Sequence, residues 1–176
     1  MNKALKNLTS PQNSIWLTDK FYDSSSLFNL GGTLLIHQKV YFDILERAIN
    51  LFIKKNDGMR LSFELQGDKT YQYVQEYSYK KLPVYNVNTE QELHSLENDF
   101  IHTKFNISKS FLYEFKLIKL KNGHGGFNII LHHLISDAWS MSLLVNEIID
   151  IYSKLLKGET ISEELNPSYI EYIESE

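Results

Sequence analysis

Apolar and polar residues alternate along the chain in two different periods, which together predict a mixed fold of helices and strands. Apolar residues at helical spacing predict amphipathic helices over residues 11–21, 41–55, 89–104 and 137–157. Shorter runs of apolar or alternating residues predict strands over residues 27–37, 59–66, 71–76, 83–87, 111–120 and 127–133. This order of elements indicates an α/β or α+β domain with a mixed or mainly antiparallel sheet packed against helices.

Local signals set the ends of several elements. Ser10 is a suitable N-cap for the first helix, and Pro11 is favoured at its first position. The Asn122-Gly123 pair predicts a hairpin turn between the last two strands. The Gly31-Gly32 pair inside a strand indicates a bulge or a close approach of another backbone. A last helix is expected to begin near Pro167.

Composition narrows the classes of function. A chain of 176 residues has the size of one domain and typically buries about 70% of its unfolded surface. The net charge of −4 and the pI near 5.9 give no basic patch, so we expect no nucleic-acid partner. The chain has no cysteine, which excludes disulfides and a cysteine nucleophile and is compatible with a reducing compartment.

No membrane or export signal stands out in the sequence. Residues 1–7 lack the apolar stretch of a signal peptide. No run is long and apolar enough to cross a bilayer. We therefore expect a soluble cytoplasmic domain without a membrane partner.

The most distinctive chemistry lies in residues 131–140, where adjacent histidines are followed by an aspartate. Successive side chains of a strand face opposite sides, so His132 and His133 are expected to point away from each other. That separation, and the lack of a third ligand at a familiar spacing, argue against a zinc site. One structural, buried histidine would be an ordinary finding. A pair at a strand end, directly before a helix that carries Asp137, is harder to explain as packing alone.

Asp137 and Arg60 each allow two interpretations. Asp137 lies where the helix begins, so it could cap that helix, which stabilises by about 0.5–2 kcal/mol. It could also hold the loop so that a histidine points into a cleft. Arg60 could be a solvated cation at a strand end, or it could form a buried pair with a carboxylate.

Three segments, in order, resemble the motifs of the condensation domains of nonribosomal peptide synthetases. Residues 132–140 resemble the HHxxxDG motif, with Ala138 in place of its glycine and Trp139 and Ser140 after it. Residues 10–16 resemble the opening motif of the family, and residues 55–63, which include Arg60, resemble the second. Asn56-Asp57 stands where the family commonly has His-Glu. This replacement looks more like starter-type or otherwise atypical members of the family.

The resemblance implies a chloramphenicol-acetyltransferase-like fold. A complete condensation domain has two such lobes with a tunnel between them, and residues 1–176 match only the N-terminal lobe. The helix that begins near Pro167 is still running at Glu176, which suggests a longer chain cut at the lobe junction. The implied activity is amide formation between an acyl or peptidyl thioester and an amine, with no catalysis by the lobe alone.

The resemblance also implies the partners and the roles of the residues. Substrates would arrive on the phosphopantetheine arms of carrier proteins, with no directly bound cofactor, and the C-terminal lobe and neighbouring modules would be further partners. His133 would be the catalytic histidine, and His132 a packed neighbour. Asp137 would be structural and paired with Arg60, which would leave the His133 imidazole neutral, near its reference pKa of about 6.5. A neutral ring can act as general base or orient the amine.

Other functions remain open at this point. An epimerisation domain shares the double-histidine motif. A coenzyme A-dependent acyltransferase of the same fold usually has a single histidine in an HxxxD motif. A lobe that only docks carrier proteins, without catalysis, belongs to a different class and is kept open by Ala138.

Overall fold

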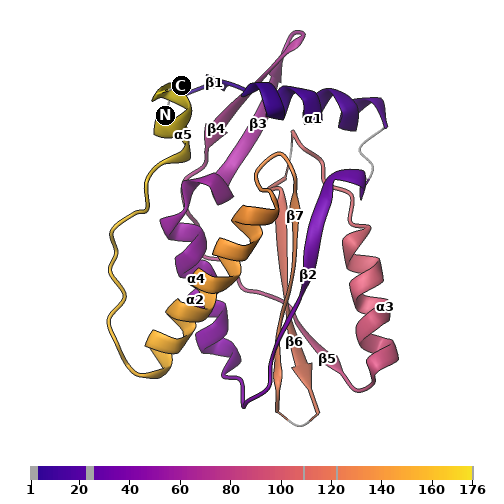
Figure 1. Ribbon diagram of the computed structural model, residues 1–176, viewed down its shortest axis with the longest axis vertical. Coiled ribbons are helices and arrows are strands. Elements are labelled where there is room, and N and C mark those ends of the chain that lie inside the picture. The colour runs from indigo at the N-terminus through magenta and orange to yellow at the C-terminus, as the bar shows by residue number, and fades with distance from the viewer. Residues whose placement is uncertain (1–3, 23–25, 109, 122, 176) are drawn as a thin grey trace.

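The structure, a computed structural model, describes residues 4–22, 26–108, 110–121 and 123–175 (Figure 1). In chain order the elements are β1 (Lys6–Asn7), α1 (Ser10–Phe21), η1 (Ser26–Phe28), β2 (Asn29–Ile36), α2 (Phe42–Lys55), η2 (Asp57–Arg60), β3 (Leu61–Gln66), β4 (Lys69–Val74), β5 (Val84–Val87), α3 (Glu90–Ile101), β6 (Tyr113–Leu120), β7 (Gly125–His132), α4 (Ala138–Leu156) and α5 (Tyr169–Ser175). The symbol η marks a short 3-10 helix.

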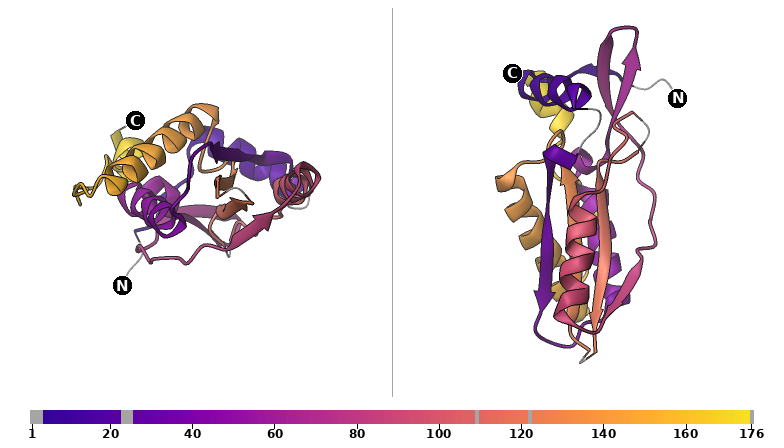
Figure 2. Two further views of the ribbon diagram at one scale, coloured as in Figure 1. Left: turned by 90° about the horizontal axis from the view of Figure 1, so that it is seen from below. Right: turned by 90° about the vertical axis from the view of Figure 1, so that its right-hand side faces the viewer.

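The main sheet has the strand order β2-β7-β6-β5, and only β5 and β6 run parallel. Helices α2 and α4 pack together on one face of this sheet, and α3 lies on the other side (Figures 1 and 2). All residues of β7 are buried, so this strand is covered on both faces. The expected mixed sheet packed with helices is also confirmed.

The core on the α2 and α4 side is apolar, because the two helices and the sheet each present an apolar face. Buried side chains of α2 and α4 recur at helical spacing and meet those of β6 and β7. They include Leu45, Ala48, Ile49, Phe52, Leu144, Ile148 and Ile151, with Phe115, Phe127, Ile129 and Leu131 from the sheet. This layer supplies most of the burial that holds α4 against the sheet.

A second, smaller sheet of order β1-β4-β3 lies at one end of the molecule, and α1 crosses the same end above the main sheet (Figures 1 and 2). Helix α5 lies beside β1 at this end, where the ammonium of Lys6 bonds the Glu174 carboxylate. This end of the molecule therefore gathers α1, α5 and the end of β7 that carries the histidines.

Some local expectations hold and others need correction. A Cβ at Gly31 would lie 2.6 Å from the Ile129 carbonyl oxygen, which confirms a close approach of backbone. The N-cap of α1 is Thr9 and not Ser10, because Thr9 accepts from the Gln12 N–H and the Gln12 side chain accepts from the Thr9 N–H, a complete capping box. Gly123 has φ 78°, while Asn122 lies outside the described residues.

Candidate active site

Both histidines keep the register of the sheet, although β7 ends at His132. The His132 N–H donates to the Leu112 carbonyl (2.9 Å), and the His133 N–H donates to the Phe28 carbonyl on the opposite neighbouring segment (2.8 Å). The N–H groups of the two residues thus point to opposite sides, as they do in a strand, and His133 opens the turn that follows β7. The two rings therefore lie in different surroundings.

His132 is fully enclosed, with an exposed fraction of 1%. Its ring packs against those of Phe28 and Phe105, at centroid distances of 6.0 and 6.3 Å. Its Nδ1 accepts the Leu134 N–H (3.2 Å), and its Nε2 lies 3.5 Å from Oδ1 of Asp19. Burial lowers the pKa of His132, and the nearby Asp19 offsets only part of that effect. His132 is therefore a neutral, packed imidazole with its proton on Nε2.

His133 is partly exposed and lines a cavity of about 350 Å³. The cavity wall combines residues from α1, from the turn after β7, from the start of α4 and from α5: Thr9, Pro11, Gln12, Ile15, Leu134, Ile135, Ser136, Asp137, Ser140, Tyr169 and Tyr172. Among the described residues, none forms a hydrogen bond with the His133 imidazole. The ring nitrogens thus remain available to a molecule that enters the cavity.

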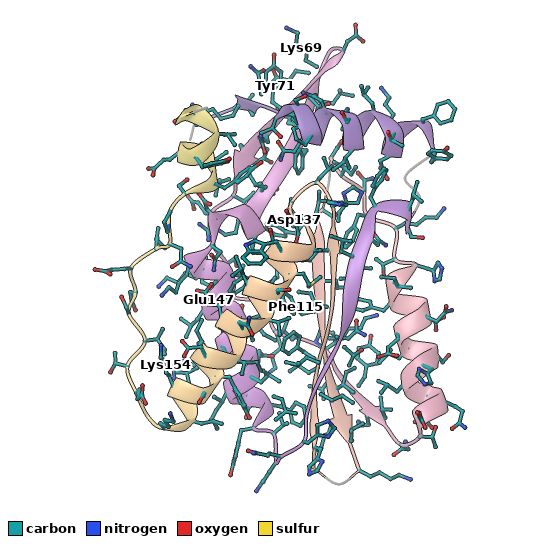
Figure 3. The ribbon with its side chains drawn as sticks, viewed as in Figure 1. Lys69, Tyr71, Phe115, Asp137, Glu147 and Lys154 are labelled. Atoms are coloured by element: carbon teal, nitrogen blue, oxygen red, sulfur yellow. The ribbon has the colours of Figure 1, made fainter. Side chains whose placement is uncertain are left out.

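Asp137 is the N-cap of α4 and lies at the end of that helix nearest α1 (Figure 3). Its Oδ1 accepts both the N–H and the hydroxyl of Ser140, each at 2.7 Å. These bonds hold the pKa of the Asp137 carboxyl below its usual value. Asp137 therefore stabilises the first turn of α4 and fixes the loop that follows His133, so the capping interpretation is confirmed.

The expected ion pair between Asp137 and Arg60 is not formed. Arg60 lies in η2 and not in a strand, and its NH1 donates to the last-turn carbonyls of Ile53 (2.7 Å) and Lys54 (2.6 Å). Its Nε donates to the Gln75 carbonyl (3.1 Å). The short turn after α2 brings the guanidinium back onto the negative end of that helix, which satisfies the orphaned carbonyls there.

The remaining motif residues occupy the first turn of α4. Ala138 is the first residue of the helix, a position whose dihedral angles suit Ala, so this substitution for Gly introduces no backbone strain. Trp139 is 74% exposed and therefore lies outside the core. Ser140 completes the cap of Asp137.

A larger cavity, of about 690 Å³, adjoins the first and shares Ile135, Ser136, Ser140, Tyr169 and Tyr172 with it. It lies between α4, η2 and the segment that leads into α5, and much of its wall is apolar: Phe52, Met59, Leu143, Leu144 and Pro167. The two cavities therefore lie side by side and share part of their wall.

Asn56 and Asp57, which replace the commoner His-Glu pair, fasten the segment before α5 to this cavity. The Asn166 amide donates to Oδ1 of Asn56 (2.9 Å) and to the carboxylate of Glu147 (3.0 Å). Figure 3 shows Glu147 on α4. Asp57 accepts the Tyr169 N–H (2.9 Å) and the hydroxyl of Ser168. Their part in the site is thus to hold a wall segment in place.

Metal-binding clusters and membrane-spanning helices are both absent from the part of the chain that the structure describes. No three His, Asp or Glu side chains among those residues gather as metal ligands would. None of the described helices combines the length and the apolar character needed to span a membrane.

The sequence patterns did not indicate that Gln12 and Asp19 would be buried beside the histidines. Their spacing of two helical turns, on the face that also carries Ile15 and Trp16, was the available signal. A polar residue at each end of an otherwise apolar helix face suggests polar partners in the protein.

Comparison with known proteins adds independent evidence. The family model described as "Condensation domain" matches residues 3–176. Surfactin synthase subunit 1 of Bacillus subtilis is 32% identical over 96% of this chain, and enniatin synthase of Fusarium equiseti is 28% identical over 92% of it. The chain spans only 5% of the length of each of those two proteins.

Solved structures agree at the level of the fold. The starter condensation domain of rhizomide synthetase matches with a TM-score of 0.88 and 21% identity over 98% of this chain. The first condensation domain of the CDA synthetase matches with a TM-score of 0.82 and 18% identity over 92% of it. The chain covers 43% of each of these structures.

Proposed function

Because the chain belongs to the condensation-domain family of nonribosomal peptide synthetases and is its N-terminal lobe, we propose that it forms one wall of an amide-forming site with His133 as the catalytic residue. Condensation domains of synthetases are in general acyltransferases. In the proposed reaction an amine attacks the carbonyl carbon of an acyl thioester on a carrier protein. The C–N bond forms, the C–S bond breaks, and the proton lost by the amine ends on the departing thiol.

One observation carries the proposal: His133 lines a cavity with both ring nitrogens unengaged by described residues, whereas its neighbour His132 is enclosed. A neutral imidazole at this place can accept a hydrogen bond from the attacking amine. It can then take the proton or hold the lone pair toward the thioester. Oδ1 of Asp137 accepts both bonds from Ser140, which lower the pKa of this carboxyl, so we assign Asp137 to holding the loop and not to taking the amine proton.

Typical rate accelerations indicate that positioning of the reactants contributes more to catalysis than general base action. General base catalysis typically contributes about 10²–10⁴-fold. Holding two reactants together gives effective molarities up to about 10⁵–10⁸ M. Because the thioester is already activated and both proposed substrates are tethered, alignment of the amine by His133 and the opposing lobe accounts for most of the expected acceleration.

The partners follow from the same proposal. Donor and acceptor carrier proteins would deliver their phosphopantetheine arms to the cavity that His133 lines. The C-terminal lobe would complete the tunnel over α4, where Trp139 and Leu143 are exposed by 74% and 54%. The isolated lobe has one wall of this tunnel, so we expect no amide formation from it alone.

The test is single-turnover amide formation by the complete condensation domain that contains this chain, with loaded donor and acceptor carrier proteins. His133→Ala is expected to lower the rate constant by about 10²–10⁴-fold. His94→Ala, which changes a histidine exposed on α3, is the matched control and should keep the rate. An unchanged rate for His133→Ala would remove His133 from the chemistry.

The same assay separates the alternatives. An epimerisation domain would racemise the carrier-bound residue without forming an amide. An acyltransferase dependent on coenzyme A would accept acyl-coenzyme A and need no donor carrier protein. A docking lobe would bind carriers with equal affinity in wild type and in His133→Ala, with no turnover in either.

A further inference from the structure

Helix α1 buries two polar residues fully, which is unusual for a surface helix. They are Gln12 and Asp19, with exposed fractions of 4% and 2%. Leu17 and Phe21 of the same helix are 64% and 83% exposed. Burial of polar groups is costly unless partners in the protein satisfy them. The partners of Gln12 and Asp19 therefore indicate what this helix does.

Gln12 is held firmly and bonds the turn after β7. Its side chain and that of Gln72 exchange two hydrogen bonds, each 2.9 Å. Its Nε2 also donates to the Leu134 carbonyl, at 3.1 Å. Because its Oε1 accepts the Thr9 N–H as well (2.9 Å), the amide has little freedom to rotate. Gln12 thus fixes the carbonyl of the residue directly after His133.

Asp19 faces the residue directly before His133. Its Oδ1 lies 3.5 Å from Nε2 of His132, and neither atom has another partner among the described residues. The Leu134 N–H occupies Nδ1 of His132, so the proton of the neutral ring must lie on Nε2, toward Asp19. Asp19 therefore helps to hold the orientation of His132, while the Leu134 N–H sets its tautomer.

We propose that Gln12 and Asp19 are positioning residues for His133, holding the residues on either side of it, Leu134 and His132, from one face of α1. This inference rests on the proposed role of His133. Neither residue reaches the cavity-facing ring; each acts through its neighbour. The two contacts fix the position of the backbone on both sides of His133 relative to α1. That position determines where the His133 ring lies relative to the substrate.

The expected effect is one of alignment. A misplacement of about 1 Å at a reacting centre can cost about 100-fold in rate. Loss of one of the two contacts leaves the other in place, so a smaller effect is expected for a single variant. Binding of the carrier proteins should not change, because the side chains of Gln12 and Asp19 are buried and out of reach of a carrier-protein surface.

The first experiment uses the complete condensation domain with loaded carrier proteins under single-turnover conditions, where the rate constant reports chemistry and the amplitude reports the folded fraction. Gln12→Met and Asp19→Ala should each lower the rate constant about 10-fold, with the half-saturating concentration of the donor carrier unchanged. Asp19→Asn keeps an oxygen acceptor toward Nε2 of His132 and should restore most of the rate. Ser14→Ala, on the exposed side of α1, is the matched control.

The second experiment observes the His132 ring itself. Nitrogen-15 NMR of labelled histidine should show His132 with its proton on Nε2 in wild type and in Asp19→Asn. In Asp19→Ala the Leu134 N–H still favours this tautomer, so we expect the same tautomer with a broadened Nε2 signal, because the ring loses its partner on that side. A merely structural role would reduce the amplitude and leave both the rate constant and the His132 signal unchanged.

The outcomes separate this inference from the proposed function. Wild-type rate constants in Gln12→Met and Asp19→Ala, with His133→Ala impaired, would overturn only the positioning role. An unimpaired His133→Ala would overturn the proposed function and, with it, the effect of α1 on rate. A sharp His132 signal in Asp19→Ala, identical to that of wild type, would contradict the role of Asp19 whatever the kinetics.

Discussion

The two regions that meet at β7 are built in contrasting ways. On the α2 and α4 side, the sheet is covered by an apolar layer in which Leu45, Ile49 and Ile148 are fully buried. At the end where α1 lies, the strand end also meets buried polar groups: Gln12 and Asp19 lie beside His132 and the turn after it, among apolar neighbours such as Phe105 and Leu134. Apolar packing is non-directional, whereas hydrogen bonds require defined angles.

The two regions therefore contribute differently: one mainly to the stability of the fold, the other to the geometry of the turn around His133. The apolar layer supplies the burial that holds α4 on the sheet, and it tolerates changes that preserve volume. The polar contacts of α1 add little net free energy, since each hydrogen bond replaces one to water. They instead fix one orientation of the turn around His133. Mutations in the two regions should therefore have different consequences.

The largest effect on stability is expected from Leu45→Ala in the apolar layer. Leu45 is fully buried, so the deletion loses transfer free energy and leaves a cavity, at a cost of about 2–5 kcal/mol in the free energy of unfolding. Urea-induced unfolding of the complete condensation domain measures this. The single-turnover rate constant of the folded fraction should stay unchanged. A lowered rate constant with unchanged stability would contradict the separation of the two regions.

A second prediction concerns Arg60 and Asp137. Arg60→Met removes the donors to three carbonyls, and we expect a loss of about 1–3 kcal/mol in the free energy of unfolding. Asp137→Ala removes the cap of α4 and should cost about 0.5–2 kcal/mol. Urea unfolding of each single variant measures the two losses.

The double variant tests whether Arg60 and Asp137 interact. The hydrogen bonds of the two side chains go to different partners, so the two losses should add to within about 0.5 kcal/mol in a double-mutant cycle measured by urea unfolding. Asp137→Asn, which can still cap the helix, is the matched control. A coupling free energy well above that limit would indicate that Arg60 and Asp137 do interact, as the sequence led us to expect.

The smallest predicted effect is a pH dependence that arises from His132. Burial lowers its pKa in the folded state, so the unfolded chain binds a proton that the folded protein excludes. Stability should therefore fall as the pH drops below about 6.5, by at most about 1.4 kcal/mol per pH unit. The ionisable groups that act on His132 are Asp19 and His133.

His132→Asn isolates this contribution, because its side-chain oxygen can still accept the Leu134 N–H. Urea midpoints at about pH 7 and pH 5, on either side of the reference pKa of histidine, should differ less in this variant than in wild type. Equal differences would mean that His132 does not titrate between the two states. Such a result would weaken the contrast between a neutral buried ring and the accessible His133.

Local patterns predicted most elements well and their ends less well. The periodicity of apolar residues in α2 and α4 set these helices within a residue or two of the observed bounds. The N-cap of α1 was assigned to Ser10, because Ser before Pro is a strong signal, but the Thr9–Gln12 capping box was stronger. Arg60 was placed in a strand because apolar residues follow it directly, although it lies in η2.

The candidate site could be found from the sequence but not completed. The adjacent histidines and Asp137 identified the place, and strand alternation separated the two rings correctly. Gln12 and Asp19 were missed, since their partners Leu134 and His132 lie more than a hundred residues further along the chain. Arg60 was assigned to the wrong partner for a related reason, because any buried carboxylate was a plausible partner until the fold placed the end of α2 beside it.

Sequence alone determined the alternating helices and strands, the order of the three motifs and the position of His133 at a strand end, because these depend on periodicities and on neighbouring residues. The tertiary structure decided which polar groups meet: Asp19 with His132, Gln12 with the Leu134 carbonyl, and Arg60 with the last carbonyls of α2. The physical reason is that apolar burial needs only the right face of an element, whereas a hydrogen bond needs a particular atom at about 3 Å.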